Sequence, residues 1–64
     1  MPRTVIPDSL KGLVIPPECR VTLAESVAYQ RRYATATLKA HRNVTSVPWL
    51  RQIIDAIIAE REGR

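Results

Sequence analysis

Arg20 and Thr22 are the residues with the most specific chemistry, because they lie two positions apart and share one face wherever the chain is extended. Arginine can donate two hydrogen bonds to O6 and N7 of guanine, and threonine can offer a hydroxyl group to a base or a methyl group to thymine. A two-stranded β-ribbon fits the major groove, which is about 12 Å wide. We therefore expect both side chains to contact DNA bases. The plain alternative is that they are solvent-facing strand residues.

A second candidate site lies at Thr45, Ser46 and Val47, directly before a strongly patterned helix. The first N–H groups of a helix have no partner within the helix, and the helix dipole favours an anion there. We expect these three residues to contact a DNA phosphate. An ordinary helix cap explains the same residue types and is compatible with that contact.

The charge of the chain is basic, with a formal net charge of +4 and a pI near 10.0. No acidic residue lies between Glu25 and Asp55. The cations of this stretch are Arg31, Arg32, Lys39, Arg42 and Arg51. A positive surface favours polyanions, of which nucleic acid is the commonest in a cell. A basic face that only keeps the protein soluble is an equally good explanation, so charge alone does not decide the function.

Other site chemistry has little support in the sequence. Cys19 and His41 are the only cysteine and the only histidine, which is too few for a zinc site in one chain. Gly12 and Gly63 are too far apart to form a glycine-rich phosphate loop. We expect Cys19 to be a small core residue. The sequence therefore predicts no metal site, no cofactor and no enzyme activity.

Proline content and the periodicity of apolar residues predict an arm, a strand and two helices. Residues 1–17 hold four of the five prolines, which predicts an extended N-terminal arm. Residues 18–23 alternate between polar and apolar side chains, as in a half-buried strand. Residues 24–41 contain no glycine or proline and predict a first helix, and residues 46–62 predict a second. The body at residues 18–64 is thus mostly α with one short β-strand.

The single strand predicts association. Its N–H and C=O groups need a partner strand, either the arm or a second copy of the chain. Thr22 and Glu25 fit a capping box, which leads the strand directly into the first helix. The second helix carries more isoleucine than a thin, alanine-rich first helix can cover, so we expect a homodimer. The expected dimer core is Val21, Leu23, Val27, Leu38, Trp49, Leu50, Ile53, Ile54, Ile57 and Ile58.

Length and composition exclude several classes of protein. Sixty-four residues form at most one domain, which is marginally stable alone. No apolar stretch approaches the roughly 18 residues that span a bilayer, and the N-terminal residues lack the pattern of a signal peptide. A single cysteine cannot form an internal disulfide. We expect a cytoplasmic protein that does not bind membranes.

Two segments resemble a known family. The segment from Cys19 to Val27 (CRVTLAESV) resembles the strand-to-helix junction of ribbon-helix-helix repressors of the Arc and MetJ type. The segment from Ser46 to Glu60 (SVPWLRQIIDAIIAE) resembles their second helix. The resemblance implies an intertwined homodimer in which two chains pair their strands antiparallel, and the resulting ribbon enters the major groove. It implies a sequence-specific transcriptional repressor.

Other functions remain open. Proteins of the same fold serve as antitoxins or as centromere-binding proteins in plasmid partition, which would add a toxin or a partition protein as partner. Residues 4–11 and a possible hairpin at residues 13–23 also weakly resemble swapped-hairpin regulators. A small helical adaptor that binds only protein is the remaining alternative.

Overall fold

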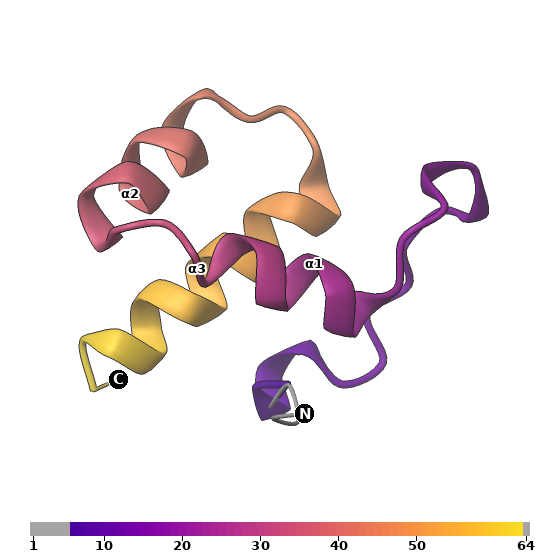
Figure 1. Cartoon of the computed structure of the whole chain (residues 1–64), viewed down its shortest axis with the longest axis horizontal. Helices are drawn as coiled ribbons and strands as arrows, with labels where there is room; N and C mark the ends of the chain where they lie inside the picture. The colour runs from indigo at the N-terminus through magenta and orange to yellow at the C-terminus, as the bar shows by residue number, and fades with distance from the viewer. Residues whose placement is uncertain (1–5, 64) are drawn as a thin grey trace.

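The computed structural model describes residues 6–63 and is built from helices (Figure 1). Its three α-helices are α1 (Leu23–Gln30), α2 (Thr35–Val44) and α3 (Pro48–Arg61). Two short 3-10 turns precede them, η1 (Asp8–Leu10) and η2 (Pro17–Cys19). The helices α1 and α2 both pack against α3, and so does η1. No helix in the described range is long and apolar enough to cross a membrane.

The helix α3 covers most of the helix predicted at residues 46–62 and organises the core. Pro48 occupies its first turn, where the missing N–H would have had no partner within the helix. The side chains spaced three and four positions apart lie on one face and are buried by the same chain. These buried side chains are Ile53, Ile54, Ile57 and Ile58, each at most 1 % exposed.

The single helix predicted at residues 24–41 is wrong, because the chain turns at residues 31–34 and forms α1 and α2 instead. No glycine or proline marks this break. The Tyr33 N–H donates to the carbonyl of Gln30 at 3.1 Å, which closes a turn, and Ala34 is then extended. The break lets two short helices lie against α3, where one straight helix would have covered it along a single line. Packing against α3 therefore overrides the local helix propensity.

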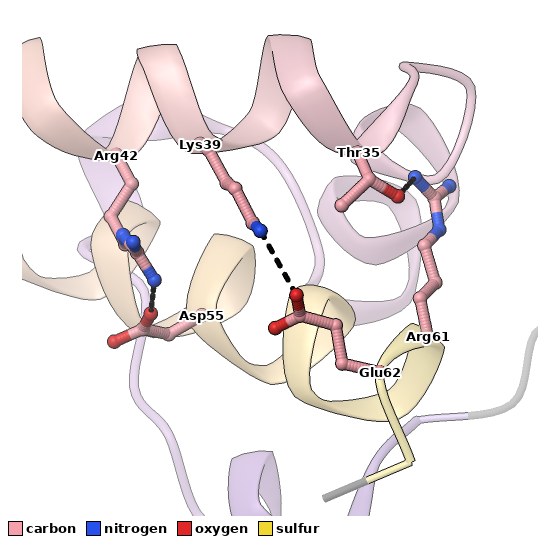
Figure 2. A network of polar contacts seen from close by, with 6 residues as sticks. All are labelled: Thr35, Lys39, Arg42, Asp55, Arg61 and Glu62. Carbon is pink, nitrogen blue, oxygen red and sulfur yellow. Dashed lines mark hydrogen bonds and ion pairs between the residues drawn. The ribbon is translucent and has the colours of Figure 1, made fainter.

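Arg61 at the end of α3 holds this turn in place. Its guanidinium donates to the carbonyl of Arg31 at 2.8 Å and to the carbonyl of Tyr33 at 2.7 Å. It also donates to Oγ1 of Thr35 at 3.3 Å, as Figure 2 shows. The carbonyls at the end of a helix have no partner within it, so a cation there satisfies them and matches the helix dipole.

The strand predicted at residues 18–23 is also wrong, and the described residues contain no strand. Pro16 and Pro17 lead into the 3-10 turn η2, and Arg20 then adopts a left-handed conformation with φ 55°. Such a residue interrupts the extended backbone that strand pairing needs. Cys19 belongs to this turn and is exposed, which corrects its expected place in the core. The segment that contains η2 projects from the three helices in Figure 1.

The capping box predicted at the start of the first helix is present. The Glu25 N–H donates to Oγ1 of Thr22 at 3.1 Å, and the Thr22 N–H donates to Oε1 of Glu25 at 3.2 Å. These two bonds satisfy groups that a helix start leaves without partners. They also fix where α1 begins.

Part of the predicted N-terminal arm belongs to the core. Leu10 in η1 is only 1 % exposed and joins the buried cluster formed with the isoleucines of α3. Ile6, Leu13 and Ile15 pack against the same cluster. The arm therefore covers apolar surface that the sequence assigned to a second copy of the chain. Residues 1–5 of the predicted arm lie outside the described residues.

Replacing Leu10 with alanine should test this role of the arm. The substitution removes a fully buried side chain and should lower the free energy of unfolding by about 2–4 kcal/mol. The measurement is urea unfolding followed by helical circular dichroism. Val14→Ala is the matched control, because Val14 is 79 % exposed and its loss should change little. Equal stability of the two variants would show that the arm does not pack as described.

Candidate binding site

A pocket of about 420 Å³ lies between α1 and the first turn of α3. The chain segment that leads from η2 into α1 closes one side of it. The pocket is lined by Val21, Glu25, Ser26, Tyr29, Gln30, Trp49 and Leu50. Pockets of this size accept small molecules or single side chains of a partner protein.

The walls of the pocket are apolar and aromatic. Val21 is 41 % exposed and Tyr29 is 54 % exposed, so both keep large surfaces in contact with water. Trp49 and Leu50 pack against the core on one side and line the pocket on the other. Clustered apolar side chains at the surface, with polar groups among them, are typical of interaction sites.

Two polar side chains of the pocket are buried. Ser26 and Gln30 are each 9 % exposed, and they are the buried polar residues of the described chain. They lie one helical turn apart on α1. Oε1 of Gln30 is buried and has no hydrogen-bond partner. A buried acceptor without a partner costs about 1–3 kcal/mol, and a donor from an occupant would recover this free energy once the side chain turns the oxygen toward the pocket.

A hydrogen bond orients the Tyr29 ring at the edge of the pocket. The hydroxyl group of Tyr33 donates to the hydroxyl oxygen of Tyr29 at 3.0 Å, and the two rings meet edge to face. Tyr33 also meets His41 edge to face, with 5.2 Å between the ring centres. The hydrogen bond to Tyr29 favours the protonated phenol and raises the pKa of Tyr33. The two tyrosines therefore connect the pocket to α2.

The two residues predicted to contact bases do not share a face of a strand. Arg20 is exposed and left-handed at the end of η2. The hydroxyl group of Thr22 accepts the Glu25 N–H at the start of α1. Thr22 thus has a structural role in this chain that the strand interpretation did not require.

The predicted phosphate-contact residues do come together. Thr45, Ser46 and Val47 line a shallow hollow of about 260 Å³ at the start of α3. The Val47 N–H donates to Oγ1 of Thr45 at 3.4 Å, and the Thr45 N–H donates to the carbonyl of His41 at 2.9 Å, so two of the three expected backbone donors are already used. Arg51 and Gln52 line the same hollow; the sequence indicated Arg51 only as a cation of the basic stretch and did not indicate Gln52. Their position in the first turns of the patterned helix was the available signal.

The predicted dimer core divides into two groups. The chain itself buries Val27, Leu38, Ile53, Ile54, Ile57 and Ile58. Of the other four, Leu23 packs against that core, and Val21, Trp49 and Leu50 line the pocket. The isoleucines therefore do not require a second copy, and the homodimer stays a prediction. Three members of the predicted core thus lie at the pocket, while the more exposed Val14 and Val44 lie outside it.

Acidic residues of α3 and its C-terminal end neutralise much of the basic stretch. Lys39 Nζ lies 2.9 Å from a carboxylate oxygen of Glu62, and a guanidinium nitrogen of Arg42 lies 2.7 Å from Asp55, as Figure 2 shows. A third pair joins Arg31 to Glu60 at 2.9 Å. These pairs are partly exposed and contribute little stability each. They also reduce the net positive charge of the basic stretch.

The metal-binding residue types do not cluster. No group of three or more histidine, cysteine, aspartate or glutamate side chains in residues 6–63 can hold a metal ion.

Comparison with models of known protein families finds no match, and comparisons with curated proteins and solved structures find none either. The resemblance to ribbon-helix-helix repressors therefore gains no support from them.

Tyr29→Phe should lower the pKa of Tyr33. The substitution removes the acceptor that favours the protonated phenol, so Tyr33 should ionise at lower pH, as followed by phenolate absorbance. In the unmodified protein, the stabilisation from this bond should be complete below the pKa of an unfolded tyrosine and disappear as pH rises through the folded value. Tyr33→Phe is the control. It removes the phenol that ionises at raised pH, so the corresponding change in phenolate absorbance should disappear. If Tyr33 has the same pKa in Tyr29→Phe as in the unmodified protein, the hydrogen bond to Tyr29 is not what raises that pKa.

Proposed function

We propose that this chain is a small protein-binding module, which holds an apolar side chain of a partner protein in the pocket between α1 and α3. The observation that carries the proposal is the combination of apolar walls with the buried, unpaired oxygen of Gln30. Binding sites commonly join a mainly apolar lining to a few polar groups that fix the orientation of the occupant. The function is therefore that of an adaptor.

The charges support a protein partner over a nucleic acid at this site. Glu25 is the only charged residue that lines the pocket, and its carboxylate repels phosphate. Three central cations, Arg31, Lys39 and Arg42, pair with acidic residues of α3 and its C-terminal end. The aromatic side chains Tyr29 and Trp49 are of the types enriched in protein interfaces.

Acetyl-phenylalanine amide should test the pocket, with acetyl-glycine amide as the comparison. The first should shift the NMR signals of the Trp49 indole and the Gln30 amide with a dissociation constant on the order of millimolar, because it fills the pocket with one side chain. Acetyl-glycine amide should not. Val21→Asp should abolish the shifts by placing a charge at the wall, whereas Val44→Asp, at a residue 80 % exposed outside the pocket, should retain them. Shifts equal in both variants would contradict the proposal.

We propose DNA binding as the second candidate function, in the form of a sequence-specific repressor, an antitoxin or a partition protein. The observation that favours it is the meeting of Thr45, Ser46 and Val47 with the cation Arg51 at the start of α3. The Ser46 hydroxyl and N–H, helped by an arginine at the helix start, are groups that suit a phosphate. Arg20 and Thr22 would contact DNA in this second function only if residues 18–23 formed a strand and paired with a second chain.

Salt titration with a random DNA duplex should test the second candidate. Binding that depends on phosphate contacts should weaken steeply as salt rises, and Arg51→Ala should reduce the salt slope by about 1. Arg32→Ala is the matched control, since Arg32 is exposed at the turn between α1 and α2. Absence of duplex binding at low salt would reject this function and leave the adaptor function untouched.

A further inference from the structure

We infer that the pocket recognises a peptide segment in which a large apolar residue stands next to a lysine or arginine. The apolar side chain fills the space between Tyr29 and Trp49, a backbone N–H of the segment donates to Gln30, and the cation pairs with Glu25. This inference rests on the proposed protein-binding function and names the chemistry of the partner.

The amide of Gln30 points to a peptide backbone as the group that enters the pocket. Its oxygen is buried without a partner, and Gln30 as a whole is only 9 % exposed. A carboxamide offers one acceptor and two donors. A peptide group offers the matching N–H and C=O, whereas a purely hydrocarbon ligand leaves the amide unpaired. The pocket therefore selects an apolar group that carries a hydrogen-bonding backbone.

Glu25 specifies the charge beside the apolar residue. It is exposed at the pocket, and Oε1 of its carboxylate accepts the Thr22 N–H at 3.2 Å. An ionised carboxylate has about four acceptor positions, so this bond leaves capacity for a cation. No lysine or arginine lines the pocket to compete with a cation of the partner. Complementary charge at the edge of an interface selects partners and orients them.

Among the described residues outside the pocket, a second copy offers no exposed large apolar side chain with a cation beside it. Val21 follows Arg20 and is exposed, but it is itself a wall of the pocket. Val14 and Val44 are the most exposed large apolar residues in the described part of the chain, at 79 % and 80 %. Val14 stands between leucine and isoleucine, and Val44 stands between asparagine and threonine, so neither has a cation beside it in sequence. Two copies with a net charge of +4 each also repel one another. The observations therefore favour a different protein as the occupant.

The test uses the full chain and three capped dipeptides, with the Trp49 indole signal as the measure of binding. Acetyl-Phe-Arg-amide should bind about three-fold tighter than acetyl-Phe-Glu-amide at low salt, and the ratio should fall towards one as salt rises. Acetyl-Gly-Arg-amide should not bind. Glu25→Gln should erase the preference for arginine while α1 stays capped, because glutamine also serves in a capping box.

A second measurement isolates Gln30. Replacing the phenylalanine N–H of acetyl-Phe-Arg-amide by an ester oxygen removes the donor and should weaken binding to the unmodified chain several-fold. Gln30→Leu should bind the peptide and its ester analogue equally. An unchanged circular dichroism spectrum shows that each variant is folded. Equal loss on esterification in both proteins would overturn the role of Gln30.

The outcomes separate this inference from the proposed function. If no peptide shifts the Trp49 signal, the protein-binding function itself fails. If the arginine and glutamate peptides bind equally, the function stands and the charge preference is overturned. If sedimentation shows a dimer that buries Trp49 and excludes all the peptides, the occupant is a second copy and the inference is overturned.

Discussion

The fold depends on removing the isoleucine face of α3 from water within a single short chain. A 64-residue chain has few residues to spare, so α1, α2 and η1 are all placed by this requirement. α1 and α2 are separate short helices because both lie on α3, and the N-terminal arm contributes Leu10 to the same cluster. The pocket lies at the edge of this arrangement. There the first turn of α3, with Trp49 and Leu50, extends beyond what the arm and the helices cover.

The sequence predicted those features whose signals are local. The spacing of Ile53, Ile54 and Ile57 marked α3, and the pairing of Thr22 with Glu25 marked the start of α1. The break between α1 and α2 was missed because its main polar support, Arg61, stands about 30 positions away in the sequence. The strand was predicted from alternating residue types alone. Two prolines and a left-handed Arg20 instead produce a turn from the same residues.

The candidate site was predictable only in part, for the same reason. The sequence indicated that Val21, Trp49 and Leu50 are apolar residues to be buried, but it assigned their burial to a second copy of the chain. Gln30 was not recognised, since a glutamine in a helix is usually exposed and only the packing of α1 on α3 buries it. The basic stretch carries less net positive charge in the folded chain than the sequence suggested. The acidic partners that neutralise it come from α3 and its C-terminal end.

The contacts of the Arg61 guanidinium bear on the order in which the chain folds. The carbonyls that it binds belong to residues translated well before it, so on the ribosome they remain hydrated until the last turn of α3 has left the exit tunnel. Contacts between distant positions are entropically costly and form late. The polar support of the corner between α1 and α2 is therefore complete only once the last turn of α3 has formed.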